Sequence, residues 1–185
     1  VGKSTIAMAT ALTYVKAGRK VLYLNLEEMN STEMFFEEEP VAPEFLAGFK
    51  AQDRYDELIS ERIKQDEKTQ VMYFDRDALS IEPSFVGQLS TIMERVIDEN
   101  IANIIVVDFS CAYDQINEQT LEAIDYLTLV CDTQMHATFK LKQWLEVSDI
   151  QEKIKEKLKL VVNQGKEISI PIKLDVIGRI DKLYA

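Results

Sequence analysis

The residues best suited to chemistry in this chain are a glycine and a lysine followed by two hydroxyl side chains. They are Gly2, Lys3, Ser4 and Thr5. This is the second half of a phosphate-binding loop, in which backbone N–H groups surround the phosphates, a lysine neutralises them and a hydroxyl binds Mg²⁺. The glycine-rich first half would precede Val1, so we expect a fragment of a longer protein. The alternative is an ordinary solvated helix start with Ser4 as its N-cap.

Two further polar side chains each close an apolar run that is typical of a buried strand. Asp108 follows the run 104–107, and a carboxylate at such a strand end can hold Mg²⁺. Asn163 closes a run made of Lys159 and the apolar residues 160–162, and its amide can both donate to and accept from a purine edge. Each has a plainer interpretation, because turns and loops commonly begin with Asp or Asn.

Glu27 follows a third apolar run, 21–26, and a carboxylate there would point toward the phosphates and orient an attacking water. A surface carboxylate on a loop is the alternative, and the sequence leaves both open. The single histidine, His136, is expected to cap a helix or lie at the surface. We find no Cys/His spacing typical of zinc and no nucleophile–base pair.

The elements that must position these residues alternate between helix and strand. Residues 4–16 have apolar side chains at helical spacing, Gly18 ends that helix, and the strand 21–26 follows. The alternation predicts an α/β fold, with a doubly wound, mainly parallel sheet flanked by helices in a single domain over residues 1–185. Ligands of such sheets bind at the carboxyl ends of the strands. The other expected elements are strands over 71–74, 104–108, 126–131, 158–163 and 175–180, and helices over 44–68, 86–100, 136–145 and 150–157.

Composition limits the partners and the compartment. A formal net charge of −11 argues against non-specific binding to nucleic acid or to an anionic membrane, since both need a positive surface. Hydrophobic residues make up 46% of the chain, which indicates a globular protein, and no run approaches the roughly 18 apolar residues of a membrane span. Cys111 and Cys131 lie in apolar surroundings, as is typical of reduced, buried cysteines in the cytoplasm.

The order of these pieces resembles the MinD/ParA family of deviant-Walker ATPases, whose fold is P-loop NTPase-like and of SIMIBI type. The resemblance rests on residues 2–5, 17–27, 108 and 161–163. Residues 23–27 and 31–36 are most similar to the TadZ/CpaE branch, whose members help place pilus or secretion machinery at a cell pole. The resemblance implies a cytoplasmic homodimer that binds ATP and Mg²⁺ and has protein partners in such a system.

The resemblance also assigns roles to individual positions. Nucleotide binding is implied for Gly2, Lys3, Ser4, Thr5 and Asn163, metal binding for Ser4 and Asp108, and a catalytic role for Glu27.

Three departures from the family pattern bear on hydrolysis. The signature lysine would lie upstream of Val1, Ser110 stands where a proline is common, and Asn25 and Glu27 replace two aspartates. The extra methylene of Glu27 moves its carboxylate by about 1 Å or more, and catalytic geometry is sensitive on this scale. We therefore expect weak or absent hydrolysis.

Two other functions remain open at this stage. The first is a catalytically inactive scaffold of the same fold that binds protein partners through its acidic face. The second is a small-molecule enzyme that uses the same loop. Direct membrane attachment is not expected, because the C-terminal residues form no basic amphipathic helix.

Overall fold

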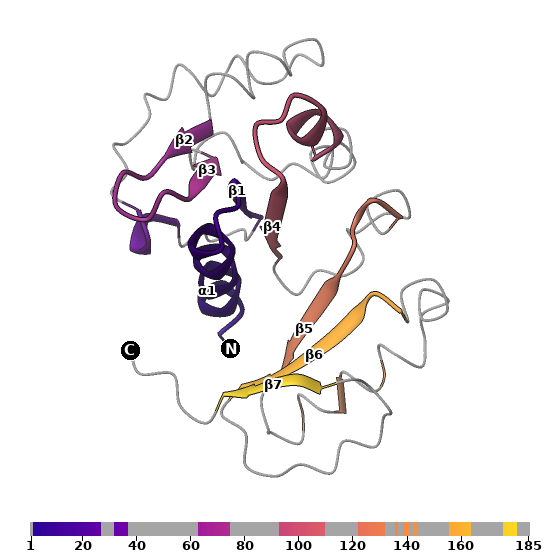
Figure 1. The fold of residues 1–185 in the computed structure, drawn as a ribbon. Helices are drawn as coiled ribbons and strands as arrows, with labels where there is room; N and C mark the ends of the chain where they lie inside the picture. The colour runs from indigo at the N-terminus through magenta and orange to yellow at the C-terminus, as the bar shows by residue number, and fades with distance from the viewer. Residues whose placement is uncertain are drawn as a thin grey trace, which may run out of the picture. The chain divides into compact units, whose positions relative to one another are not determined.

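The computed structural model describes part of the chain, in two compact units. One unit lies within residues 3–120, and the other comprises residues 1–2 and 121–185. The described parts are drawn in colour in Figure 1. They are residues 2–26, 32–36, 63–74, 93–109, 122–131, 136, 139–140, 143, 156–163 and 176–180.

The first helix, α1, spans Lys3–Lys16, one residue longer than predicted. Its end is closed by two backbone hydrogen bonds: Gly18 N–H donates to the Val15 carbonyl at 2.8 Å and Arg19 N–H to the Tyr14 carbonyl at 3.0 Å. This is a Schellman cap, which needs a residue in the left-handed region, and Gly18 has φ +77°. The predicted helix stop at Gly18 is confirmed, and the chain turns there into the first strand.

A four-stranded sheet lies beside α1 in the first unit, in the order β2-β3-β1-β4. Its strands are β1 Val21–Asn25, β2 Ile63–Gln65, β3 Met72–Phe74 and β4 Ile104–Asp108. The central strand β1 pairs in parallel with both β3 and β4, and β2 pairs antiparallel with β3 at the edge. All five residues of β1 are buried, as a near-continuous apolar run in a parallel sheet requires.

The pairing of β1 with β4 is held at both ends. At the start, Lys20 N–H donates to Asn103 Oδ1 and Asn103 N–H donates to the Lys20 carbonyl, each at 3.0 Å. At the far end, Leu26 N–H donates to the Asp108 carbonyl at 2.8 Å. The two strands therefore stay in register over their whole length, and Asn25 stands opposite Asp108.

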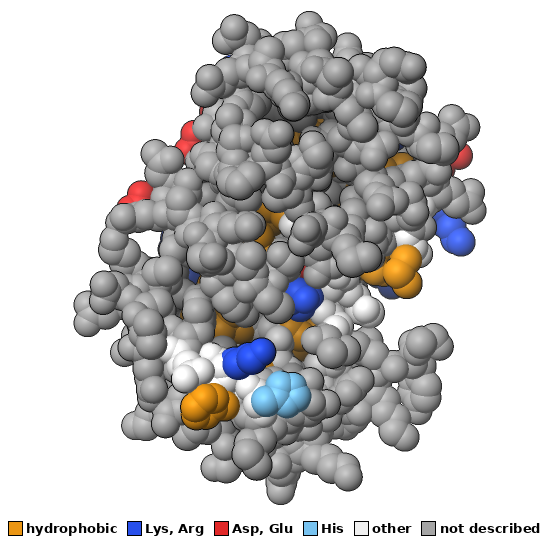
Figure 2. Space-filling model, turned by 180° about the vertical axis from the view of Figure 1, so that it is seen from behind, with side chains coloured by type: hydrophobic (Ala, Val, Ile, Leu, Met, Phe, Trp, Pro, Cys, Tyr) orange, Lys and Arg blue, Asp and Glu red, His pale blue; other side chains and the backbone are white. Residues whose placement is uncertain are grey.

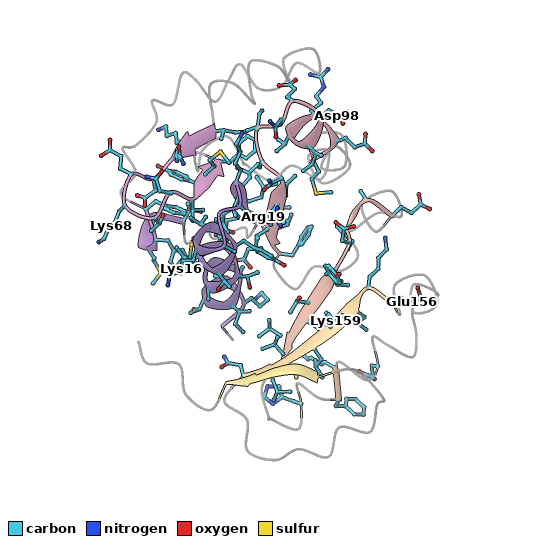
Figure 3. The ribbon with its side chains drawn as sticks, in the orientation of Figure 1. Lys16, Arg19, Lys68, Asp98, Glu156 and Lys159 are labelled. Atoms are coloured by element: carbon cyan, nitrogen blue, oxygen red, sulfur yellow. The ribbon has the colours of Figure 1, made fainter. Side chains whose placement is uncertain are left out.

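A hydrophobic cluster of this unit lies between α1 and one face of the sheet, and the short 3₁₀ helix η1, Thr32–Met34, brings two phenylalanines to it. Phe36 is buried and Phe35 packs against the cluster. Side chains of the described core are drawn in Figure 3. The buried members are Met8, Ala11, Val21, Tyr23, Phe36, Val71 and Tyr73.

The helix predicted over 44–68 is wrong at its end, because residues 63–65 form β2; residues 44–62 lie outside the described part. The turn from β2 to β3 is built on Asp66, whose Oδ2 accepts hydrogen bonds from Thr69 N–H at 2.7 Å and from Thr69 Oγ1 at 2.6 Å. Gln70, the last residue of the turn, adopts the left-handed conformation with φ 62°. Side-chain closure of the turn and antiparallel pairing with β3 outweigh the helix propensity of this segment.

The helix predicted over 86–100 is present at residues 93–98, and its earlier part lies outside the described residues. It ends in the same type of cap as α1. Asn100 has φ 54°, its N–H donates to the Ile97 carbonyl at 2.9 Å, and Ile101 N–H donates to the Val96 carbonyl at 3.0 Å. Asn tolerates the left-handed region better than most residues, which explains the stop at this position.

The second unit contains a parallel sheet in the order β5-β6-β7. Its strands are β5 Leu127–Cys131, β6 Leu158–Asn163 and β7 Val176–Ile180, close to the predicted bounds. Leu160 pairs with Val176 and Val161 with Gly178, so β7 carries one extra residue in a bulge. Cys131 is buried and is not in a disulfide, as expected, and Cys111 lies outside the described residues.

Two predicted helices fall in the second unit. Residues 136, 139–140 and 143 are helical, in agreement with the helix predicted over 136–145. Residues 156–157 form a turn rather than the end of the helix predicted over 150–157, because Leu158 already begins β6. The remaining residues of both segments lie outside the described part.

Five large hydrophobic side chains of the described residues are exposed. In the ranges covered by the structure, no helix has the length and apolar character that a bilayer crossing needs. On the face in Figure 2, hydrophobic side chains of the described residues reach the surface only singly, which is usual for folded proteins. The large ones that are exposed are Tyr14, Met34, Ile97, Tyr126 and Phe139.

Candidate functional site

The start of α1 and the end of β4 lie at the same edge of the first sheet, namely the edge formed by the carboxyl ends of its parallel strands. The chain reverses at Gly18, so α1 runs opposite to β1 and to β4, which is parallel to β1 (Figure 1). A helix of 14 residues is about 21 Å long and a strand of five residues about 17 Å. The first turn of α1 therefore reaches the edge at which Asn25 and Asp108 end their strands.

The helix start has the features that an anion would need. Gly2 directly precedes α1 with φ 86°, a conformation that glycine adopts without strain. Lys3 and Ser4 are half-buried and Thr5 is exposed. The first turn of α1 contains no acidic residue, so no side chain there offsets the positive end of the helix dipole.

Asp108 is a buried carboxylate whose position is set by its neighbours. Its side chain is 2% exposed, and its Oδ2 accepts a hydrogen bond from the Tyr23 hydroxyl at 3.0 Å. Asn25, opposite it in β1, is 3% exposed. A carboxylate removed from water to this extent requires hydrogen bonds or a cation. This edge of the sheet thus carries an acidic and an amide side chain next to each other.

This donor set fits Mg²⁺ bound together with phosphates. Mg²⁺ is usually held by one or two carboxylates plus phosphate oxygens and water, rather than by a cage of protein ligands. Asp108 supplies one carboxylate and Ser4 one hydroxyl at the same sheet edge. Within the described ranges, no three His, Cys, Asp or Glu side chains come close enough to hold a metal by themselves.

Of the remaining predicted site residues, one lies outside the described residues and two lie in the second unit. Glu27 lies outside the described residues. Asn163 ends β6 in the second unit, where it is 0% exposed and stands opposite Ile180 of β7. His136 is exposed, as expected for a surface histidine. Lys3, Ser4, Thr5 and Asp108 therefore belong to the first unit, whereas Gly2 and the adenine candidate Asn163 belong to the second.

Sequence reasoning missed Tyr23 as a member of the site. It appeared only as part of a buried apolar strand, and its partner Asp108 is 85 residues away in the chain. One signal was present: a tyrosine in a fully buried strand must find a partner for its hydroxyl. The sequence did not say which partner, because the register of β1 against β4 decides it.

The chain matches no family model and no curated protein sequence. Its fold does match solved structures. The MinD cell division protein of Aquifex aeolicus has a TM-score of 0.68 at 16% identity, over 97% of this chain and 76% of that one. A ParA family ATPase from Chlorobium tepidum TLS has a TM-score of 0.68 at 18% identity, over 97% of this chain and 78% of that one.

A third match contains bound ligands. Cobyrinic acid a,c-diamide synthase from Mycobacterium smegmatis, with a bound ATP analog and magnesium, has a TM-score of 0.57 at 13% identity, over 88% of this chain and 69% of that one. MinD of Aquifex aeolicus also matches in its complex with MinC, with a TM-score of 0.62 at 15% identity, over 92% of this chain and 72% of that one. The chain therefore has the α/β fold, with a mainly parallel sheet, of MinD- and ParA-type SIMIBI P-loop proteins.

Proposed function

We propose that the protein is a nucleotide-dependent localisation or assembly ATPase of MinD/ParA type. It acts as a cytoplasmic homodimer in which residues 1–185 form one P-loop ATPase-like domain. The observation that carries this proposal is the convergence of the α1 start and the buried Asp108 at one edge of the first sheet. A triphosphate at this edge would contact a helix N-terminus on one side and, through Mg²⁺, a strand-end carboxylate on the other.

Each candidate residue has one role in this proposal. Gly2 lets the backbone approach the phosphates, Lys3 neutralises the β- and γ-phosphates, and Thr5 contacts the α-phosphate. Ser4 and Asp108 hold Mg²⁺, which neutralises developing charge when it is bound. Asn163 contacts the adenine and Glu27 orients the attacking water.

Hydrolysis is weak or absent in this proposal. Asn25 in the first unit supports weak hydrolysis, because the MinD/ParA family has an aspartate at this position. An amide at this position carries no negative charge and accepts no proton, and Asn25 is buried beside Asp108. ATP binding then acts mainly by stabilising one of two conformational states of the dimer. Slow ATP hydrolysis limits the rate at which the dimer leaves that state.

The partners in this proposal are proteins. The MinC:MinD complex of Aquifex aeolicus is an example of this fold with a protein bound. For the chain itself, the resemblance to the TadZ/CpaE branch supports a partner in pilus or secretion machinery. The net charge of −11 makes nucleic acid an unfavourable partner.

Calorimetric titration of the full-length protein with Mg-ATP tests the proposal. Lys3→Ala should weaken binding by about 10- to 100-fold, the equivalent of one charge-assisted hydrogen bond. Lys16→Ala is the matched control, because it removes the same side chain from the last turn of the same helix (Figure 3). It should leave the affinity unchanged. Absence of ATP binding in the parent protein would refute the proposal and favour a scaffold of the same fold.

A further inference from the structure

We infer that Tyr23 is a positioning residue for the metal site, because its buried hydroxyl holds the Asp108 carboxylate in the orientation that binds Mg²⁺ with nucleotide. The inference rests on the proposed function and adds a residue to it. Tyr23 lies in β1 two residues before Asn25, which stands opposite Asp108. Tyr23, Asn25 and Asp108 therefore share one face of the sheet, since side chains alternate along a strand.

The hydrogen bond from Tyr23 to Asp108 is well placed for this role. The Tyr23 hydroxyl donates to Oδ2 of Asp108 at 3.0 Å, and the two side chains are 1% and 2% exposed. Water therefore does not compete for either group. A hydrogen bond to a charged acceptor in such surroundings is stronger than one between neutral groups. It limits rotation of the carboxylate and so limits where its metal-binding lone pairs point.

Aromatic packing fixes the Tyr23 ring itself. Phe35 and Phe36 meet it edge to face, with ring centroids 6.4 Å and 6.2 Å from that of Tyr23. Phe36 in turn stacks on Tyr73, at a centroid distance of 4.3 Å and an interplanar angle of 7°. A ring held on several sides cannot swing its hydroxyl away from Asp108. This is the support that a metal ligand needs from the residues behind it.

A purely structural role is the competing explanation, in which the bond only satisfies the buried Tyr23 hydroxyl. The two explanations differ in what they predict for Mg²⁺. If Tyr23 positions Asp108, its hydroxyl affects the Mg²⁺ requirement but not metal-free nucleotide binding. If the role is structural, removal of the hydroxyl lowers stability and leaves the Mg²⁺ requirement of the folded protein unchanged.

The test compares ATP binding by the full-length protein in EDTA and at graded Mg²⁺ concentrations. Tyr23→Phe should raise the Mg²⁺ concentration for half-saturation about tenfold or more, as for other residues behind a metal ligand. Its ATP affinity in EDTA should equal that of the parent. Tyr73→Phe is the matched control, because it removes a hydroxyl from the same aromatic cluster on β3, which β1 separates from β4. It should leave both quantities unchanged.

A double-mutant cycle then asks whether Tyr23 acts through Asp108. Asp108→Asn should itself raise the Mg²⁺ requirement, and addition of Tyr23→Phe to it should change little further. A tenfold effect of Tyr23→Phe that persists in the Asp108→Asn background would overturn the inference. So would a Tyr23→Phe protein with the Mg²⁺ requirement of the parent.

A spectroscopic measurement covers the case in which Tyr23→Phe does not fold. Fluorotyrosine incorporated at Tyr23 keeps the hydroxyl, and its fluorine resonance should shift when Mg²⁺ is added to the ATP-saturated protein. Fluorotyrosine at Tyr73 should shift less. An unchanged resonance at Tyr23 would overturn the inference alone, whereas a parent protein that binds no ATP would overturn the proposed function and this inference together.

Discussion

The substitution Asn25→Asp tests the geometry of the candidate site most directly. It changes one amide into a carboxylate of nearly the same shape, so packing is preserved. The new carboxylate would stand opposite Asp108, in a pair of positions that are 3% and 2% exposed. The substitution also restores the residue type that the resembled family has at this position. We expect it to destabilise the ligand-free protein.

The size of the effect follows from the strand spacing. Neighbouring strands lie about 4.8 Å apart, so two carboxylates on paired residues are separated by about 5 Å. At an effective dielectric constant of about 20, two like charges at that distance repel by about 3 kcal/mol. The free energy of unfolding at neutral pH should therefore fall by about 3 kcal/mol, a large part of the stability of an ordinary domain.

Urea unfolding followed by circular dichroism measures this repulsion in a double-mutant cycle. The four proteins are the parent, Asn25→Asp, Asp108→Asn and the double variant, and the coupling energy isolates the pair of carboxylates. Asn163→Asp serves as the control for burial of a single new carboxylate. Asn163 is 0% exposed and stands opposite Ile180, which carries no charge.

A coupling energy below about 1 kcal/mol would refute the reasoning. It would mean that the two side chains do not face each other across the strand pair, or that water reaches both of them. In either case Asn25 and Asp108 would not form a common edge site. A large loss in Asn25→Asp that Asp108→Asn does not relieve would point instead to burial of the new charge alone.

Two further predictions concern the elements that position the site. Gly18→Ala should lower the free energy of unfolding by about 1 kcal/mol in urea, since a methyl group there meets no atom within 4 Å and only the left-handed backbone opposes it. Gly18→Asn should lower the free energy of unfolding by less. Equal stability of Gly18→Ala and the parent would contradict the left-handed helix cap at Gly18. Asp66→Ala should cost about 1–2 kcal/mol, because Oδ2 accepts two hydrogen bonds from Thr69. Amide hydrogen exchange in β2 and β3 should be faster, and unchanged exchange would show that the turn forms without Asp66.

Much of the fold could be predicted because its signals are local. The helical spacing of apolar residues and Gly18 predicted α1 and its end, and both are confirmed. Apolar runs of four to six residues predicted β1, β4, β5 and β6, since a short continuous apolar run is typical of a strand in a parallel sheet. The alternation of helices and strands then predicted a mainly parallel sheet.

The strand β2 could not be predicted in the same way. Residues 63–65 contain Ile63, Lys64 and Gln65, which a helix accepts as readily as a strand. Their conformation depends on the partner β3 and on the Asp66 turn between them. A short edge strand takes its stability from pairing rather than from its own residues.

The sequence by itself determined the kinds of side chain available to the site: a lysine and hydroxyls at a helix start, and carboxylate and amide groups at strand ends. Only the tertiary structure decided that Asn25 faces Asp108 and that the Tyr23 hydroxyl reaches its carboxylate. The physical reason is the register of β1 against β4. Helix and strand patterns repeat over a few residues, whereas this register is set by contacts between segments some 85 residues apart in the chain.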